Sequence, residues 1–196
     1  MKTKKYLILT LVALVSCGIF WGTVIVWANG DPEILEEYKQ VKRSTLRGLQ
    51  GVELFVMGPT AEIEKYGLTE SQIRTDVELK LRQAGVKVLS SKERYKTPGA
   101  PLLTVFALVR KWPESEVFSV DVRAGLTQSV VLVRDRSILC NATTWETFPV
   151  GGVIAAKDLQ SVRRVVKDHV DEFINDYLAA NPKEQPPKKD LAEKRK

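Results

Sequence analysis

Residues 51–89 read GVELFVMGPTAEIEKYGLTESQIRTDVELKLRQAGVKVL, and this stretch decides the expected fold. Residues 52–57 are mostly apolar and predict a strand. Thr69 followed by Gln72 has the spacing of a capping box, so a helix is expected to begin there. Residues 86–89 predict a second strand. A strand–helix–strand unit of this kind joins two parallel strands by a right-handed crossover.

Four further strands and a long helix are expected after this unit. Residues 102–109 are apolar on both faces, which is typical of a central strand, whereas residues 117–124 alternate between apolar and polar side chains. Residues 129–134 and 138–147 predict two more strands. The last helix is expected over residues 157–179, where apolar side chains recur at helical spacing.

The connections between these elements carry turn and loop signals. Residues 90–100 are polar and predict a loop, Gly125 predicts a bulge or turn, and residues 135–137 predict a tight turn. Gly151 and Gly152 are expected to lead directly into the last helix.

Together these elements predict an α+β fold. We expect a two-layer α/β sandwich, in which a mixed, mostly antiparallel sheet carries two long helices on one face and an N-terminal membrane-targeting helix precedes it. The chain is expected to have four parts: a signal peptide or signal-anchor transmembrane helix over 1–28, a juxtamembrane helix or linker over 29–45, an α/β periplasmic domain over 46–182 and a disordered charged tail over 183–196.

The N-terminal segment predicts export. Three lysines precede the 23 uncharged residues 6–28, a run long enough to cross a bilayer as a helix. Three interpretations stay open: an uncleaved anchor, a signal peptide cleaved near Ala28, and a lipoprotein signal that places lipid on Cys17. All three leave the N-terminus in the cytoplasm and the domain outside, because the positive charge precedes the span. We therefore expect a periplasmic protein, either held in the cytoplasmic membrane by residues 6–28 or released by cleavage.

The net charge of +6 comes from the two ends of the chain. Of the 30 basic residues, three lie in 1–28 and six in 183–196, which leaves 21 in residues 29–182. Of the 24 acidic residues, three lie in 183–196, which also leaves 21 in the body. A neutral domain lacks the concentrated basic face that nucleic-acid binding needs, so no nucleic-acid partner is expected.

No catalytic group, metal site or cofactor is predicted. His169, the one histidine, is expected to be a solvated residue on the flank of the last helix. Cys140 is expected to be a small buried residue in a strand, because nothing beside it in the sequence would lower the pKa of a thiol. One histidine without clustered cysteines leaves no ligand spacing for zinc.

Four residues are weak candidates for binding. Gly151 and Gly152 before a helix could hold an anion with their backbone amides, although a hinge or tight turn is the favoured explanation of the pair. Thr144 and Trp145 end the preceding strand and could line the same cleft, although both are ordinary sheet residues.

Three stretches carry a family resemblance: residues 67–89, the tetrapeptide Ala142-Thr143-Thr144-Trp145, and VDEFINDYL at residues 170–178. Over residues 46–182 the chain resembles a family of small exported bacterial proteins for which no activity is established. The resemblance implies bacterial export and supplies no site residues.

The sequence favours a non-enzymatic envelope protein that acts as an interaction or adaptor domain for another envelope component. The alternative is a periplasmic protein that binds a small molecule or a lipid. An enzyme is the third hypothesis, and a cleft that brings Asp121 or Glu146 against a second carboxylate would favour it.

Overall fold

The computed structural model describes residues 32–182, so the predicted targeting segment and the predicted charged tail lie outside the described residues. The chain divides into two compact units, Met1–Val41 and Lys42–Lys196. Helix α2 (Pro32–Ser44) has its last three residues in the second unit. Within residues 32–182, no helix is both long and apolar enough to cross a membrane.

The described chain has an α+β fold with a mixed sheet, which confirms the fold class predicted from the sequence. The strands are β1 (Val52–Met57), β2 (Val88–Leu89), β3 (Leu102–Lys111), β4 (Val117–Leu132), β5 (Asp135–Glu146) and β6 (Val150–Ala155). After α2, the helices are α3 (Ala61–Glu64), α4 (Glu70–Gln83), α5 (Ser91–Arg94) and α6 (Ser161–Ala180), with a 3₁₀ turn η1 (Ala156–Asp158) before α6.

The sheet has the order β2-β1-β3-β4-β5, and β6 also pairs with β4. Strand β1 is parallel to β2 and β3, as expected for the strand–helix–strand unit, and the other pairings are antiparallel. Strands β5 and β6 follow one another along the same side of β4: β5 pairs with residues 125–132 and β6 with residues 117–122. They therefore form one interrupted outer strand, broken near Pro149.

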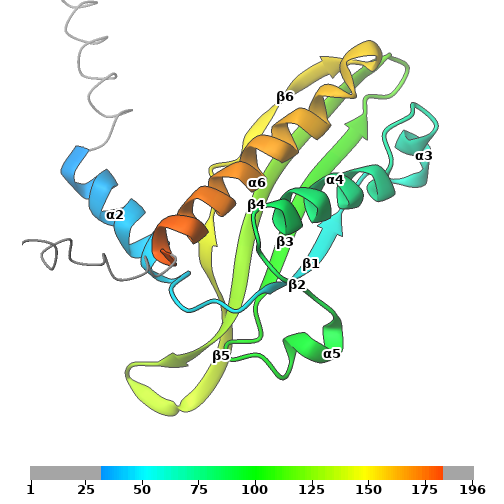
Figure 1. Ribbon diagram of the computed structural model, residues 1–196. Helices are drawn as coiled ribbons and strands as arrows, with labels where there is room; N and C mark the ends of the chain where they lie inside the picture. Colours follow the sequence, from blue (N-terminus) through cyan, green and yellow to red (C-terminus); the bar gives the residue numbers. More distant parts are fainter. Residues whose placement is uncertain (1–31, 183–196) are drawn as a thin grey trace, which may run out of the picture. The chain divides into compact units, whose positions relative to one another are not determined.

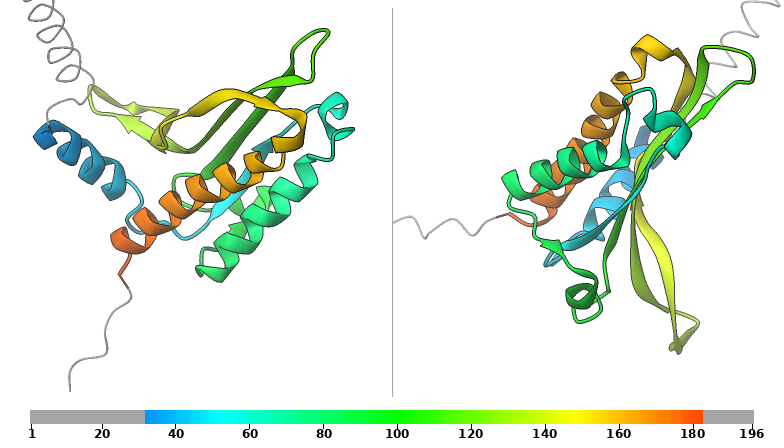
Figure 2. Two further views of the ribbon diagram at one scale, coloured as in Figure 1. Left: turned by 90° about the horizontal axis from the view of Figure 1, so that it is seen from above. Right: turned by 90° about the vertical axis from the view of Figure 1, so that its right-hand side faces the viewer.

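Helices α4 and α6 lie side by side against the same side of the sheet (Figure 1; Figure 2). Each helix packs an apolar stripe of side chains against the strands. The buried residues of the stripes are Ile73, Val77 and Leu81 of α4, and Val162, Val166, Val170 and Phe173 of α6. Along β3, alternate residues Leu103, Val105, Ala107 and Val109 join the same core.

Helix α4 begins with the predicted capping box. The Thr69 hydroxyl accepts a hydrogen bond from the Gln72 amide, and the Gln72 side chain accepts one from the Thr69 amide, both at 3.2 Å. Thr60 occupies the equivalent position of α3, but its side chain makes no capping hydrogen bond. The Thr69 side chain thus provides an acceptor for a backbone amide of the first helical turn, whereas the Thr60 side chain does not.

Replacing Thr69 by alanine is expected to lower the free energy of unfolding by about 1 kcal/mol, because a helix amide loses its acceptor. Thr60→Ala is the matched control and is expected to change stability by less than about 0.5 kcal/mol. Urea unfolding of the full chain in mild detergent, followed by far-ultraviolet circular dichroism, measures both. Equal losses in the two variants would contradict the capping role.

Two predicted strands are one continuous strand. Residues 117–124 and 129–134 were expected to be separated at Gly125, but β4 runs without a break through this residue. Gly125 is paired with Thr104 on one side and Glu146 on the other, so neighbours hold it in the sheet. The predicted irregularity is present one residue later, as a register shift between Leu126 and Thr127.

The hairpin turn and the loop over 90–100 also differ from the prediction. The turn lies at Val133 and Arg134, and β5 already begins at Asp135. The Asp135 carboxylate accepts hydrogen bonds from the amide and the hydroxyl of Ser137. Such local hydrogen bonds are common in turns, which is why residues 135–137 predicted one. The predicted loop contains α5, which begins with a Ser90–Glu93 capping box.

Gly151 and Gly152 do not lead into a helix. They lie in β6, a strand that the sequence did not predict, and pair with Asp121 and Val120 of β4. Helix α6 begins only at Ser161. The prediction is wrong because the apolar run around the glycines satisfies its backbone by pairing with β4.

Candidate functional site

The face of the sheet opposite α4 and α6 is the candidate site, and we call it the uncovered face. Along β1, β3 and β4 the residues between the core positions point to this side, because successive side chains of a strand alternate. The uncovered face comprises Phe55, Met57, Thr104, Phe106, Leu108, Arg110, Ser119, Asp121, Arg123, Gly125 and Thr127. Phe55 and Met57 are 45% and 41% exposed, so large apolar side chains meet water here.

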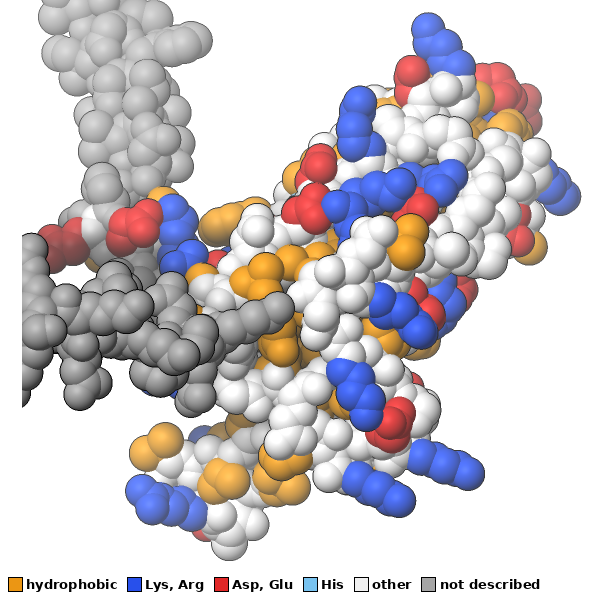
Figure 3. All heavy atoms as spheres, in the orientation of Figure 1, with side chains coloured by type: hydrophobic (Ala, Val, Ile, Leu, Met, Phe, Trp, Pro, Cys, Tyr) orange, Lys and Arg blue, Asp and Glu red, His pale blue; other side chains and the backbone are white. Residues whose placement is uncertain are grey.

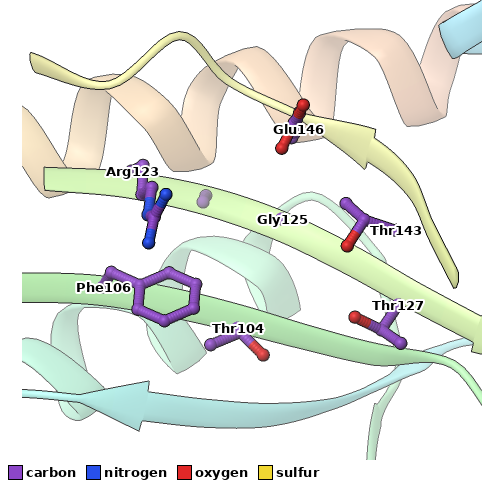
Figure 4. A pocket seen from close by; sticks show the side chains of 8 residues that line it. Thr104, Phe106, Arg123, Gly125, Thr127, Thr143 and Glu146 are labelled. Atoms are coloured by element: carbon purple, nitrogen blue, oxygen red, sulfur yellow. The ribbon is translucent and has the colours of Figure 1, made fainter. Parts of the chain in front are cut away.

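A hollow of about 190 Å³ lies in the middle of this face, over β3, β4 and β5 (Figure 4). Gly125 lies among its lining side chains and has no side chain of its own to fill the space. The lining residues are Thr104, Phe106, Arg123, Ala124, Gly125, Thr127, Thr143 and Glu146.

Arg123 and Phe106 lie next to each other on neighbouring strands at one end of the hollow. The Arg123 guanidinium lies 4.6 Å from the centre of the Phe106 ring, a cation–π distance. Its ionic contact is weak, since its Nε is 3.9 Å from the Asp121 carboxylate. A cation is thus placed over an aromatic ring with room to pair with an added anion.

The other polar groups of the hollow also have bonding capacity to spare. Within residues 32–182, the hydroxyls of Thr104, Thr127 and Thr143 and the carboxylate of Glu146 make no hydrogen bond or ion pair. The hollow therefore offers one cation, one anion and three hydroxyls to a bound group. This combination suits an amphipathic surface better than a purely apolar ligand.

A second hollow of about 350 Å³ adjoins the first on the uncovered face and shares Arg123 with it. It is lined by Leu108, Arg110, Ser119, Val120, Asp121 and Arg123. The two hollows follow β3 and β4 for most of their paired length. This arrangement is a shallow trough along the strands rather than a deep cavity.

The uncovered face continues onto a two-stranded arm, residues 129–140, which extends beyond the start of β3. Figure 2 shows the arm projecting away from the helices. Its large apolar side chains are exposed: Val131 at 51%, Val133 at 93%, Ile138 at 41% and Leu139 at 67%. Val131 and Leu139, which pair with each other, continue the alternation of the uncovered face. Figure 3, seen from the side of α4 and α6, shows further apolar side chains on the hairpin. Such a ribbon does not bury its own side chains, so a partner would shield them.

The four weak binding candidates do not line either hollow. Trp145 is 1% exposed and faces α6, with its ring edge-on to Phe173 at 5.1 Å. The Thr144 hydroxyl accepts a hydrogen bond from Gln128 at 2.7 Å, on the helix side of the sheet. Gly151 and Gly152 belong to β6. Ligand binding by these four residues stays a prediction. Neither hollow brings them together in one cleft.

A buried polar cluster surrounds Trp145, and the sequence did not reveal it. Trp145 Nε1 donates to the Asp176 carboxylate at 2.9 Å, and Arg43 donates to the other oxygen of Asp176 at 2.9 Å. Lys42 donates to Glu172 at 2.8 Å and lies 5.0 Å from the centre of the Trp145 ring. The cluster fixes the end of α2 to α6 and β5.

Asp121 and Glu146, the residues of the enzyme hypothesis, do not face a second carboxylate in any described contact. The one ionic contact of Asp121 among residues 32–182 is with Arg123. Within the same residues, no group of three or more His, Cys, Asp or Glu side chains could hold a metal ion.

Cys140 is only half-buried and lies on the arm in β5, so the prediction of a buried core residue is wrong. The prediction assumed that this strand is covered, whereas within residues 32–182 the arm has neither β3 nor a helix beside it. Trp112 follows β3 in a turn and is 53% exposed.

His169 is 7% exposed, so the prediction of a solvated position is also wrong. The helix flank on which it lies packs against β4. Its Nε2 atom has no hydrogen-bond partner among the described residues. Burial lowers the pKa of His169, and this effect exceeds the opposing effects of Glu172, the Val122 backbone and Asp168. Burial therefore favours the neutral form of the imidazole.

We expect the free energy of unfolding to fall as the pH falls from 7 towards 5. The unfolded chain takes up a proton near the ordinary histidine pKa of about 6.5, which folded His169 resists, so acid favours unfolding with a slope of at most about 1.4 kcal/mol per pH unit. Asp76, whose pKa Arg163 lowers, contributes only in more acidic solution. His169→Gln should flatten the decline between pH 7 and 5 in urea titrations. An unchanged decline would contradict this account.

Comparisons of the chain with protein-family models, with curated proteins and with solved structures found no match.

Proposed function

We propose that this protein is a non-enzymatic interaction domain of the bacterial cell envelope, exported across the cytoplasmic membrane. In this proposal the domain is a two-layer sandwich, with α4 and α6 covering one face and a partner protein covering the other. The partner docks on the uncovered face and extends along the arm at residues 129–140.

The observation that carries this proposal is the continuous surface formed by the uncovered face and the arm. Large apolar side chains are exposed at both ends of this surface, Phe55 and Met57 on β1 and Leu139 on the arm, and the polar hollow lies between them. Protein interfaces combine apolar and polar side chains, with aromatic residues, Met and Arg enriched. The hollow at Gly125 has a size that suits one large side chain of the partner, and its unpaired Glu146 and threonine hydroxyls suit a polar end on that side chain.

The alternative is a protein that binds a small molecule or a lipid. The trough supports this alternative less well than it supports protein docking, because sites for drug-sized ligands are typically about 300–1,000 Å³ and bury most of the ligand. The hollow at Gly125 is below that range, and the larger one is an open part of the same face. A ligand held here would be small and polar.

Export is supported by the sequence of the N-terminal segment, which has three lysines before 23 uncharged residues. The resemblance to small exported bacterial proteins points the same way. Protease added to spheroplasts should digest residues 32–182 while leaving cytosolic markers intact, and the mass of the native N-terminus should separate the anchored, cleaved and lipidated forms. Protection of the domain until the membrane is broken would overturn export.

A charge placed on the uncovered face should prevent partner binding. Phe55→Asp introduces a charge beside Met57 on the uncovered face without touching the core, because the side chain of Phe55 is 45% exposed. Leu79→Asp is the matched control on α4, where the side chain is 54% exposed on the helix side. Pull-down from crosslinked envelopes should recover the same partner with wild type and Leu79→Asp, and at least ten-fold less of it with Phe55→Asp. Equal recovery by both variants would reject this surface.

A further inference from the structure

The outer edge of the sheet differs between β5 and β6. At the end of β5, the Thr45 hydroxyl donates to the Thr144 carbonyl at 3.0 Å and Lys42 donates to the Glu146 carbonyl at 3.1 Å. These side chains occupy backbone acceptors that another strand would otherwise use. Strand β6 pairs with β4 alone among the described strands, and no described side chain donates to its backbone. Among the described residues, the edge is protected at the end of β5 and open at β6.

The open edge carries no charge. Residues 147–156 read TFPVGGVIAA, ten residues without an ionisable side chain. Three of their apolar side chains are exposed: Phe148 at 73%, Val150 at 48% and Val153 at 59%. Edge strands of proteins that stay monomeric usually carry charges, prolines or bulges that prevent pairing. Pro149 precedes β6, and residues 150–155 have none of these features.

Gly152 is not explained by the packing of its own molecule. A Cβ atom added there would meet no atom within 4 Å, and its backbone has no conformation that requires glycine. By contrast, a Cβ atom at Gly51 or Gly58 would come within 2.6 or 2.8 Å of another residue. A glycine inside a strand weakens the strand and often marks a place where another chain comes close.

We infer that β6 pairs edge to edge, in antiparallel orientation, with β6 of a second copy of this chain. An uncharged apolar edge pairs best with another uncharged apolar strand. Every copy of the chain presents such a strand at β6. A two-fold axis through Gly152 makes the contact self-complementary and opposes no like charges.

The alternation of side chains limits the register. In an antiparallel pair, residues directly opposite each other have their side chains on the same side of the sheet. The two-fold axis must therefore place a residue opposite its own copy, and it cannot lie between two successive residues of the strand. With the axis at Gly152, Val153 of each copy lies opposite Gly151 of the other, and Val150 lies opposite Ile154. Each exposed valine then covers a glycine or an apolar side chain of the second copy.

Sedimentation equilibrium of the full chain in mild detergent tests the pairing. Wild type should be a dimer, and Val153→Lys should weaken dimerisation at least ten-fold because it places two lysines in the contact. Leu139→Lys is the matched control: Leu139 is similarly exposed, at 67%, but lies on the arm in β5, so this variant should stay dimeric. A monomeric wild type, or equal weakening by both variants, would overturn the proposal.

A disulfide crosslink tests the register without depending on a loss of stability. In a chain with Cys17 and Cys140 replaced by serine, Gly152→Cys should form a crosslinked dimer under mild oxidation, whereas Thr75→Cys on α4 should not. A dimer that Gly152→Cys fails to crosslink would overturn the register. Since this contact uses the β6 edge, Phe55→Asp should leave the dimer intact, so the outcomes for the second copy and for the envelope partner can be told apart.

Discussion

Replacing Trp145 by alanine is expected to lower the free energy of unfolding by about 4 kcal/mol, the largest effect of any single substitution considered. The side chain is 1% exposed and packs edge-on against Phe173. Its removal leaves a cavity between β5 and α6 that these elements cannot close by a side-chain movement alone. It also removes the donor to Asp176 and the ring beneath Lys42.

Urea unfolding of the full chain in mild detergent measures this loss, with far-ultraviolet circular dichroism as the signal because the substitution changes tryptophan fluorescence. Trp112→Ala is the matched control, since Trp112 is 53% exposed and should contribute less than about 0.5 kcal/mol. A loss below about 1 kcal/mol for Trp145→Ala would show that the described core around Trp145 is wrong.

Asp176→Ala is expected to cost about 3 kcal/mol, because it breaks a buried charge cluster by removing one partner. Asp176 is 7% exposed and accepts from both Trp145 and Arg43. Without it, the buried indole N–H loses its acceptor. The Lys42 cation, 8% exposed, then keeps Glu172 as its one ionic partner among the described residues. The end of α2 should loosen first.

The control for Asp176 is Asp171→Ala on the same helix. Asp171 pairs with Lys80, but its side chain is 48% exposed, so the loss should stay below about 1 kcal/mol. Asp176→Asn should recover part of the stability, because an amide oxygen can still accept from the indole. Similar losses for Asp176→Ala and Asp171→Ala would mean that the cluster is not a buried one.

The local chemistry of the sequence was sufficient to predict the strand–helix–strand unit and its parallel pairing. Thr69 and Gln72 predicted where α4 begins, because a capping box depends only on residues three apart. The apolar stripe of α6 was equally readable, since its spacing repeats over several turns. These features do not depend on what lies across the fold.

The strands on the outer side of β4 were harder to predict, because their structure depends on distant partners. Gly125 looked like a break, yet Thr104 and Glu146 hold it inside β4. Gly151 and Gly152 looked like the entry to a helix, yet pairing with β4 keeps them extended. The Ser90–Glu93 capping box, by contrast, was present in the sequence and would have predicted α5.

The hollows of the uncovered face could not be located from the sequence, and they lie apart from the four residues that were chosen as binding candidates. Thr144 and Trp145 were chosen for their place at the end of a strand, but the irregular pairing near Thr143 puts Thr143 and Glu146 on the uncovered face and Trp145 in the core. A one-residue irregularity reverses which side chains lie on the uncovered face, and periodicity alone does not locate it.

The measurement that tests the central claim most directly is site-specific photocrosslinking in living cells, with a benzophenone amino acid at Phe55 on the uncovered face and, separately, at Leu79 on α4. The account predicts one discrete crosslinked product from position 55 and none from position 79. Products from position 79 but not from position 55, or identical products from both, would contradict the claim that the helix-free side of the sheet is where this protein meets its partner.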